Sequence, residues 1–300
     1  MNITIVGAGA IGRLWGCHLA AKHTVHFWTR NQAPHITFEF TSKHSALKQS
    51  MTFSANQPQQ LQDANCIIIA VKAFQVENAL LAIKPYLAPG VPVIIMHNGM
   101  GSHQQAIALL PEQPLLYATT AQAAFRPEPH RLCHAGIGQT WLGAVNDQGS
   151  HYQSLQDELN QALPPCQWHQ DIFIPLWQKL AINCAINPLT AIHQCRNGEL
   201  ATPQFHHPLN EICFEVATVM NAEGYPATHE KLRQQVDKVI AATADNFSSM
   251  NQDVCHHRTT EIDYITGYLI TRAAEHQLAV PVNQRLWQQV KRLEQQYHDA

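Results

Sequence analysis

The first 28 residues combine a strand, a glycine turn, a helix and a second strand, and this order constrains the fold more than any other feature of the chain. Residues 2–6 are rich in β-branched side chains, a Gly-x-Gly-x-x-Gly turn follows at 7–12, and a helical stretch leads to a second strand pattern at 24–28. Such a unit is typical of the doubly wound α/β fold that binds dinucleotides. The sequence therefore predicts a Rossmann-type domain at the N-terminus.

Each glycine of this turn has its own physical task. Gly7 permits the tight turn, Gly9 has no Cβ and lets a pyrophosphate approach the backbone, and Gly12 lets the helix pack against the strand. The N-terminus of the helix adds free N–H groups and a partial positive charge. We therefore predict dinucleotide contacts at Gly7, Ala8, Gly9, Ala10, Ile11 and Gly12. The alternative is a glycine-rich turn in another kind of α/β protein.

The residues after the second strand favour one cofactor over another. A site for NAD usually has an acidic residue there, which holds the ribose 2′-hydroxyl. This chain has no acidic residue between the glycines and Glu39, and it has Arg30 instead. Because an arginine suits a 2′-phosphate through its charge and paired donors, we predict NADP(H) rather than NAD(H). The alternative for Arg30 is a solvated surface side chain.

Polar side chains follow two further apolar strands. Residues 66–71 and 91–96 are continuous apolar runs, as expected of strands covered on both faces, and Lys72, Gln75 and Asn98 come after them. Open α/β sheets bind ligands beyond the carboxyl ends of their strands, so these residues are candidates for contact with cofactor or substrate. The alternative is turn chemistry, since Asn98-Gly99 is a strong turn signal by itself.

The two halves of the chain differ in their periodicity. Strand patterns or a hairpin occur at 34–54, further strands at 115–120, 123–126 and 131–142, a helix at 152–163 and a short strand at 166–170. After about residue 170 the period of 3.6 residues predicts helices at 173–193, 206–223, 228–246, 259–276 and 282–298, the last with Pro281 at its start. The predicted fold is an α/β Rossmann-type domain, residues 1–168, followed by an all-α domain, residues 169–300.

The helix predicted at 173–193 is apolar, yet it carries Lys179, Asn183 and Asn187 four residues apart. Side chains at this spacing share one helix face. A cation and two amides there cost free energy unless a polar group meets them, and Asn is a poor helix former. The face is therefore a candidate substrate site, and the alternative is a solvated surface.

Three further candidates have good structural explanations as well. Asn197 stands where a helix end and a turn are expected. Ser249 could cap a helix together with Gln252 in a capping box. Glu261 lies near a predicted helix N-terminus, where acids are favourable, although Asp263 would serve the same purpose.

Composition excludes several classes of function. The formal net charge of -3 gives no reason to expect nucleic acid or a membrane surface as partner, and no apolar run approaches the ~20 residues that a membrane span needs. The eight cysteines form no Cys-x-x-Cys pair and no secretory signal precedes them, so a reduced cytoplasmic protein without a disulfide framework is expected. The nineteen histidines include no His-x-x-x-His pair, and no metal site is expected.

The chain as a whole resembles the ketopantoate reductase (2-dehydropantoate 2-reductase) family. The resemblance rests on the glycine turn, Lys72-Ala-Phe-Gln75, His97-Asn-Gly-Met-Gly101, Lys179-Leu-Ala-x-Asn183-Cys-x-Ile-Asn187-Pro-Leu-Thr, Asn197-Gly-Glu-Leu, Ser248-Ser-Met and Thr260-Glu-Ile-Asp-Tyr-Ile-x-Gly-Tyr. Thr119-Thr-Ala-Gln-Ala-Ala124 departs slightly from the form expected of close relatives, which we expect to adjust the cofactor pocket and not the reaction.

The resemblance implies a helical domain like that of 6-phosphogluconate dehydrogenase, a cleft between the domains, and NADPH-dependent reduction of 2-dehydropantoate to (R)-pantoate on the route to pantothenate and coenzyme A. It implies catalytic roles for Lys179 and Glu261. Substrate contacts are implied for Asn98, Asn183, Asn187, Asn197 and Ser249. Cofactor contacts outside the glycine turn are expected at Arg30, Lys72, Gln75, Asn98, Ala124 and Glu261. A monomer or a homodimer that binds this small-molecule substrate is expected.

The expected chemistry explains the residue types. Hydride addition at the C2 carbonyl places negative charge on its oxygen, where a cation that donates a proton is needed. Lysine has an ordinary pKa near 10.4, so Lys179 is expected to be protonated at pH 7 and to act as the general acid. Glu261 is expected to accept from the C4 hydroxyl and to orient Lys179, and Ser249 to take part of the carboxylate. Two alternatives stay open: reduction of another branched 2-oxo acid, and a non-catalytic NADP(H) sensor.

Overall fold

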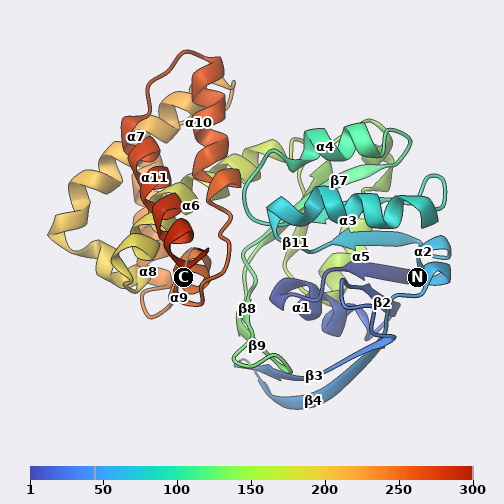
Figure 1. Ribbon diagram of the computed structural model, residues 1–300. Helices are drawn as coiled ribbons and strands as arrows, with labels where there is room; N and C mark the ends of the chain where they lie inside the picture. The colour runs from blue at the N-terminus through green and yellow to red at the C-terminus, as the bar shows by residue number, and fades with distance from the viewer. Residues whose placement is uncertain (44, 299–300) are drawn as a thin grey trace. The chain divides into compact units, whose positions relative to one another are not determined.

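The computed structural model describes residues 1–43 and 45–298, and the chain forms two compact units (Figure 1). The first unit consists of residues 1–97 and 102–172, and the second of residues 98–101 and the chain from Phe173 onward. The domain boundary predicted after residue 168 falls in the connection between the last strand of the first unit and the first helix of the second.

A seven-stranded sheet is the centre of the first unit. Its strands lie in the order β11-β10-β7-β6-β5-β1-β2. The five strands from β7 to β2 in this order are parallel to one another. Strand β10 is antiparallel to β7, and β11 is parallel to β10. The strands are β1 (Asn2–Val6), β2 (Thr24–Trp28), β5 (Cys66–Ile69), β6 (Val93–Met96), β7 (Leu115–Thr120), β10 (Thr140–Ala144) and β11 (Cys166–Trp168). Every residue of β5 and β6 is buried, which confirms the prediction from their continuous apolar runs.

Strand order reverses its direction at β1. The chain runs from β1 to β2 at one edge and then returns to the other side of β1 to form β5, β6 and β7. Such a reversal leaves a crevice beyond the carboxyl ends of the two central strands, where open α/β sheets bind their ligands. The helices of this unit are α1 (Ala10–Leu19), α2 (Pro58–Gln62), α3 (Val76–Ile83), α4 (Ser102–Leu109) and α5 (Leu155–Ala162), with short 3₁₀ turns at Ala73–Gln75, Lys84–Tyr86 and Gln148–Tyr152.

A second, four-stranded sheet in the same unit has the order β4-β3-β9-β8. It consists of β3 (His35–Ser42), β4 (Ser45–Ser54), β8 (Ala123–Phe125) and β9 (Arg131–Gly136), and β3 and β4 form the hairpin predicted at 34–54. The single strand predicted at 131–142 is wrong, because β9 belongs to this sheet and β10 to the larger one. Gly138 lies in the break, where a Cβ would come within 2.4 Å of the Ala121 carbonyl oxygen.

The second unit consists of helices and their connections, with no strand among its described residues. It contains α6 (Phe173–His193), α7 (His206–Ala222), α8 (His229–Ala242), α9 (Ser249–Cys255), α10 (Thr266–Glu275) and α11 (Pro281–His298), with 3₁₀ turns at Asn197–Ala201, Pro203–Phe205 and Ile262–Tyr264. The bounds of α6 and the start of α11 at Pro281 confirm the sequence predictions. Helices α7, α8, α9 and α11 all contact α6, so the apolar sequence of α6 is explained by its central position.

One helix prediction and one cap prediction in this unit are wrong in detail. The helix predicted at 259–276 is a 3₁₀ turn followed by α10, and the change of direction occurs at Ile265, whose φ is -103° and ψ is -87°. The cap of α9 is Ser248, which has extended backbone and accepts a hydrogen bond from the Asn251 N–H at 3.0 Å. Ser249 is the first residue of that helix and is exposed, so the capping box predicted from Ser249 to Gln252 does not form.

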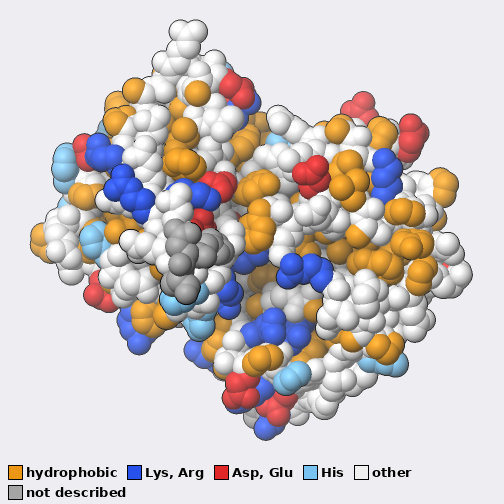
Figure 2. Space-filling model, in the orientation of Figure 1, with side chains coloured by type: hydrophobic (Ala, Val, Ile, Leu, Met, Phe, Trp, Pro, Cys, Tyr) orange, Lys and Arg blue, Asp and Glu red, His pale blue; other side chains and the backbone are white. Residues whose placement is uncertain are grey.

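The surface carries charges of both signs. Figure 2 shows Lys and Arg side chains next to Asp and Glu side chains on the visible face of the helical unit, in keeping with a formal net charge of only -3. Among the described residues, no helix combines the length and the apolar character that crossing a membrane requires.

Candidate active site

The glycine turn after β1 is sterically tight at two of its three glycines. Gly7 has a φ of +104°, and a Cβ there would lie 2.6 Å from Val71 Cγ1 and 2.7 Å from the Ala70 carbonyl oxygen. A Cβ at Gly12 would lie 2.2 Å from the carbonyl oxygen of Gly7. Real atoms do not approach so closely, and a positive φ is costly for other residues, so the turn needs glycine at both positions.

Gly9 is different, because the space beside it is open. The nearest protein atom to a Cβ at this position would be the Ala70 oxygen at 3.9 Å. Gly9 is exposed, it is the N-cap of α1, and the first turn of that helix contains no acidic residue. Open space over unpaired N–H groups at a helix N-terminus fits the pyrophosphate of a dinucleotide. Ala8, Ala10 and Ile11, which complete the predicted set, are partly exposed around this position.

Arg30 follows β2 and is exposed. The backbone beside it is fixed, because the Thr29 N–H donates to Asn56 Oδ1 at 2.7 Å and the Thr29 hydroxyl donates to Asn31 Oδ1 at 2.6 Å. Within residues 1–43 and 45–298, the Arg30 guanidinium makes no ion pair or hydrogen bond. Its charge is therefore available to an anionic ligand at the carboxyl end of β2.

Lys72 and Gln75 lie beyond the carboxyl end of β5, as predicted. Gln75 Oε1 accepts a hydrogen bond from the Lys72 backbone N–H at 3.3 Å, so part of the turn chemistry that was the alternative for these residues is present. Ala124 lies in β8 and pairs with His134 of β9 in the smaller sheet.

In the helical unit, the polar face of α6 is not solvated. Asn187 is only 6% exposed, and Lys179 and Asn183 are half-buried. The Nδ2 atom of Asn183 is buried and has no hydrogen-bond partner among the residues that the structure describes. A buried amide donor without a partner costs about 1–3 kcal/mol. This face therefore keeps a buried hydrogen-bond donor that a polar ligand would satisfy.

Lys179 interacts with a carboxylate from a distant part of the chain. Burial lowers the pKa of Lys179 from 10.5 to about 8, and the charge of Glu261 acts in the opposite direction. Glu261 is 4% exposed, and its Oε2 accepts from Asn98 Nδ2 at 3.3 Å. The structure thus brings together three of the predicted residues: Lys179, Glu261 and Asn98.

Asn98 reaches Glu261 because the loop 98–101 packs with the helical unit. The Met100 N–H donates to the Tyr264 carbonyl oxygen at 2.8 Å. Gly99 has a φ of +84°, and a Cβ there would lie 2.3 Å from the same oxygen. The chain bends at 98–100, as the alternative explanation for Asn98-Gly99 implies, and the Asn98 side chain lies within hydrogen-bonding distance of Glu261.

Asn197 and Ser249 lie on two other segments that pack against α6. Asn197 is 6% exposed and donates from Nδ2 to the Thr243 hydroxyl at 2.9 Å, while its Oδ1 is buried without a partner among the described residues. Ser249 is exposed, and the capping bond that would occupy a serine is made by Ser248 instead. Both side chains therefore keep a hydrogen-bonding atom for a ligand.

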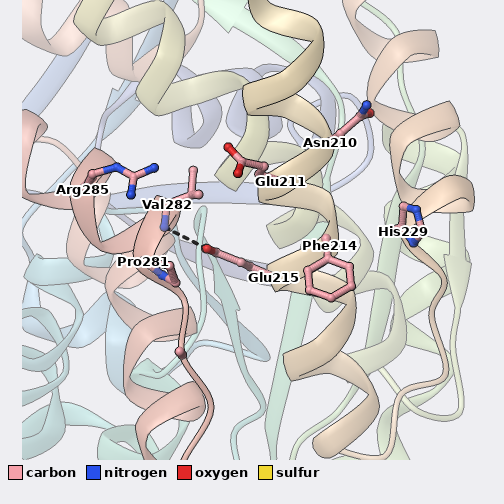
Figure 3. A pocket seen from close by; sticks show the side chains of 9 residues that line it. Asn210, Glu211, Phe214, Glu215, His229, Pro281, Val282 and Arg285 are labelled. Carbon is pink, nitrogen blue, oxygen red and sulfur yellow. Dashed lines mark hydrogen bonds between the residues drawn. The ribbon is translucent and has the colours of Figure 1, made fainter.

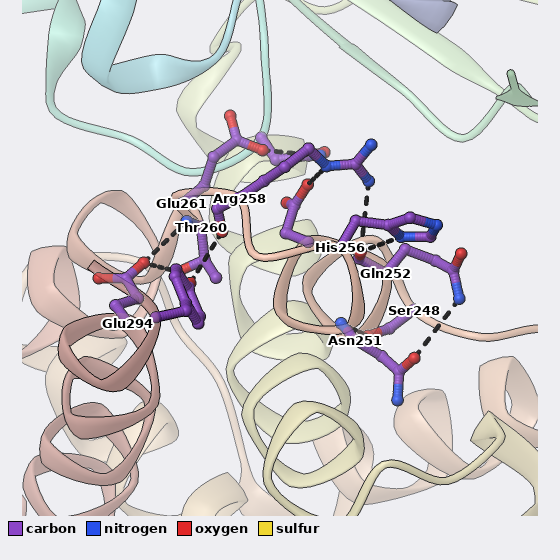
Figure 4. Close-up of polar contacts among 11 residues, drawn as sticks. Ser248, Asn251, Gln252, His256, Arg258, Thr260, Glu261 and Glu294 are labelled. Carbon is purple, nitrogen blue, oxygen red and sulfur yellow. Dashed lines mark hydrogen bonds and ion pairs between the residues drawn. The ribbon is translucent and has the colours of Figure 1, made fainter. Parts of the chain in front are cut away.

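Sequence reasoning missed the residues that support Glu261. The Thr260 N–H and hydroxyl donate to Glu294 Oε1 at 2.7 and 2.8 Å (Figure 4). Lys291 bridges Glu294 and Asp263. The sequence contains no signal for these contacts, because Thr260 and Glu294 are 34 residues apart on segments without a shared period.

A cavity of about 430 Å³ in the helical unit is a separate feature (Figure 3). It lies between α7 and the start of α11, and Glu211, Phe214, Glu215 and Arg285 are among the residues that line it. Glu215 accepts from the backbone N–H groups of Val282 and Asn283 at 2.8 and 2.9 Å, so its carboxylate serves to cap α11. None of the predicted site residues lines this cavity.

Both units of the chain match known protein families. Residues 3–147 match the family described as ketopantoate reductase PanE/ApbA, and residues 171–294 match the family described as ketopantoate reductase PanE/ApbA C terminal. A 2-dehydropantoate 2-reductase of Vibrio cholerae serotype O1 is 43% identical over 301 residues, with 100% of each chain covered. The enzyme of that name from Escherichia coli O157:H7 is 41% identical and covers 99% of this chain and 96% of the relative.

Solved structures show the same fold. A PanE/ApbA family ketopantoate reductase from Ralstonia eutropha has a TM-score of 0.89 at 26% identity, with 99% of this chain and 100% of the other covered. A D-mandelate dehydrogenase solved with NADH and anilino(oxo)acetate has a TM-score of 0.91 at 23% identity, with 99% of each chain covered. The second likeness concerns the fold alone.

An α/β unit with a glycine-rich dinucleotide turn, combined with a helical unit that holds a lysine beside a carboxylate, defines an oxidoreductase of the two-domain dehydrogenase type. Within this class, the family matches and the identity to curated relatives over the whole chain decide the assignment. The chain belongs to the ketopantoate reductase family.

Proposed function

We propose that this chain reduces 2-dehydropantoate to (R)-pantoate with NADPH, a step toward pantothenate and coenzyme A, and that Lys179 is the general acid. The family membership and the 43% identity to a 2-dehydropantoate 2-reductase support the reaction. One structural observation carries the assignment of the acid. The charge of Glu261 raises the pKa of Lys179, and Lys179 lies on a helix face where the amide donor of Asn183 is buried and unpaired within the described chain.

Lys179 supplies the proton and part of the charge stabilisation. NADPH, when bound, supplies the hydride that adds to C2. The Lys179 ammonium donates a proton to the carbonyl oxygen and stabilises the negative charge that develops there. Its pKa of about 8 leaves it mainly protonated at pH 7 and makes it a stronger acid than an ordinary lysine.

The other polar groups of the helical unit orient the substrate. Asn183 and Asn187 offer amide groups to the substrate without adding charge, and Asn197 offers its free carbonyl oxygen. The exposed hydroxyl of Ser249 takes part of the carboxylate. Glu261 accepts from the C4 hydroxyl and orients Lys179, and Asn98 stabilises the Glu261 carboxylate while also contacting the substrate.

In the α/β unit, the residues fit NADPH. The turn from Gly7 to Gly12 would hold the pyrophosphate, with Ala8, Ala10 and Ile11 around it, and Arg30 would hold the 2′-phosphate. Further contacts are proposed for Lys72, Gln75, Asn98, Ala124 and Glu261. The open space beside Gly9 and the unpaired charge of Arg30, both within the described residues, support this fit.

One assay tests the proposed reaction. NADPH consumption is followed at 340 nm with ketopantoate and with a panel of other branched 2-oxo acids. We expect ketopantoate to give the highest kcat/KM. A higher value for another 2-oxo acid would replace the substrate, and binding of NADPH without turnover of any acid would make the protein a sensor and refute the proposal.

The proposal also covers the setting in which the enzyme acts. We propose a cytoplasmic protein, in line with eight cysteines that are free of disulfides, and a monomer or homodimer. Light scattering behind size exclusion at micromolar concentration distinguishes the two assembly states, and a mass of three or more chains would contradict both.

A further inference from the structure

We propose that Glu294 is a positioning residue, which holds the turn before α10 so that the Glu261 carboxylate stays beside Lys179. This inference deepens the proposed function and rests on it for the catalytic meaning of the pair. Glu294 lies on α11, one turn from the end of the described chain, and it touches neither Lys179 nor the Glu261 side chain in any contact that the structure describes.

The first tie runs from Glu294 to the residue before Glu261. Glu294 is 4% exposed and Thr260 is 3% exposed. Glu294 Oε1 accepts from both the backbone N–H and the hydroxyl of Thr260, at 2.7 and 2.8 Å, and the same hydroxyl accepts from the Ile262 N–H at 3.2 Å. Charge-assisted bonds of this kind are shorter and stronger than neutral ones. Thr260 is therefore fixed to α11 by two bonds to one oxygen.

The second tie runs to the residue two positions after Glu261. Glu294 Oε2 pairs with Lys291 Nζ at 2.8 Å, and Lys291 also pairs with Asp263 Oδ2 at 2.9 Å. Asp263 Oδ1 accepts from Trp287 Nε1 at 2.7 Å. Figure 4 shows Glu294 and Thr260 joined by dashed lines, with Glu261 next in the chain. Both flanks of Glu261 are thus anchored to the same helix.

Glu261 needs such support because its own backbone is irregular. Its φ is -96° and ψ is +22°, a 3₁₀ turn of three residues follows, and Ile265 has φ -103° and ψ -87°. The hydrogen-bond geometry of a 3₁₀ turn is poorer than that of an α-helix. The direction of the Glu261 side chain therefore depends on what fixes Thr260 and Asp263.

The charges around this turn make Lys179 a reporter of the position of Glu261. Arg258 pairs with Asp253, and Lys291 pairs with both Glu294 and Asp263, so these five neighbouring charged groups are held in ion pairs with one another. Glu261 is the charged group that raises the pKa of Lys179 against the effect of burial. If Glu261 moves away, the pKa of Lys179 falls further below its ordinary value.

The experiment is a ¹³C NMR titration of Lys179 in the cofactor-free protein with labelled lysine, assigned by comparison with Lys179→Met. We expect Glu261→Gln to lower the Lys179 pKa by about one pH unit, as loss of a nearby opposite charge does, and Glu294→Ala to lower it by at least about 0.5. Glu294→Gln keeps an oxygen for both Thr260 donors but loses the carboxylate oxygen that pairs with Lys291, so its Lys179 pKa should lie between the values of the wild type and of Glu294→Ala. An unchanged Lys179 pKa in folded Glu294→Ala would overturn the proposal.

A second pair of variants decides the matter if Glu294→Ala does not fold. Thr260→Val removes the hydroxyl that bonds to Glu294, and Thr260→Ser keeps it. We expect a lower Lys179 pKa in Thr260→Val and no change in Thr260→Ser, and equal values in both would refute the positioning role. This readout needs no turnover, so a wild-type protein that fails to reduce ketopantoate would refute the proposed function and leave the result on Glu294 intact.

Discussion

Glu261 and burial act in opposite directions on the pKa of Lys179, and burial is the larger effect. The lysine consequently has a pKa of about 8 instead of 10.5. It remains an ammonium at neutral pH, yet it gives up its proton more readily than a solvated lysine does. A group of this kind suits general acid catalysis near pH 7, where the best acid has a pKa close to the working pH.

The alkaline limb of the pH profile follows from this pKa. Because the acid must be protonated, kcat/KM should fall as the pH rises through about 8, the value for Lys179 in the free enzyme. In Glu261→Gln the limb should move to lower pH, since the carboxylate that raises the pKa is lost. The profile is measured with NADPH and ketopantoate from pH 6 to 10. A limb above pH 10 in the wild type would contradict a perturbed lysine acid.

The burial of Lys179 should also lower the free energy of unfolding. Below pH 8 the lysine is charged in both the folded and the unfolded chain, so the folded protein bears the full free-energy cost of burying the charge. Between pH 8 and 10.5 only the unfolded chain keeps the proton, and this cost declines as the pH rises. We expect Lys179→Met to raise the free energy of unfolding at pH 7 by about 1–2 kcal/mol, discounted for partial exposure, and to lose this advantage near pH 10.5. Urea unfolding at both pH values checks the sign, and a less stable variant at pH 7 would be inconsistent with it.

Arg30→Ala tests the choice of cofactor. The guanidinium is exposed and makes no ion pair within the described chain, so its removal should not disturb the fold. We expect kcat/KM for NADPH to fall by at least ~10-fold and that for NADH to change by less than ~3-fold, because only NADPH carries the 2′-phosphate. Arg292→Ala, at an exposed position of α11, is the matched control. Equal losses with both cofactors would remove the 2′-phosphate assignment.

Two glycines of the turn should respond differently to alanine. At Gly9 a Cβ has open space in the protein, so Gly9→Ala should keep the stability within ~1 kcal/mol and raise the Kd for NADPH by at least ~10-fold. At Gly12 a Cβ would lie 2.2 Å from a backbone oxygen, so Gly12→Ala should lose ~3 kcal/mol or more of stability. Thermal unfolding and NADPH fluorescence measure both quantities. Normal NADPH binding by Gly9→Ala would argue against a pyrophosphate at this position.

Local sequence patterns were sufficient for much of the fold. The strand, glycine turn, helix and strand at the N-terminus were predicted because each glycine has a local steric cause, and the exact extent of α6 followed from its apolar period. The boundaries that failed depend on tertiary contacts. The break at Gly138 reflects the nearby Ala121 backbone, and the bend at Ile265 occurs where residues around Glu261 are tied to α11.

The candidate site, too, could be predicted from local sequence patterns only in part. The spacing of Lys179, Asn183 and Asn187 indicated a shared face, and in the structure Asn187 is buried while Lys179 and Asn183 are half-buried. The approach of Glu261 to Lys179, the bond from Asn98 and the ties to Glu294 join residues far apart in the chain. Periodicity carries no information on such contacts: the end of a strand pattern pointed to Asn98 as a candidate, but only the family resemblance joined Asn98 and Glu261 to the site of Lys179.

The central claim is that Lys179 donates the proton in the reduction, and Lys179→Ala tests it most directly. We expect kcat for ketopantoate with NADPH to fall by at least ~100-fold while the Kd for NADPH stays within ~2-fold, since a positioned acid contributes on this scale. Lys238→Ala, at an exposed position of α8, should leave both quantities unchanged. Turnover by Lys179→Ala close to that of the wild type, with NADPH bound normally, would contradict the account.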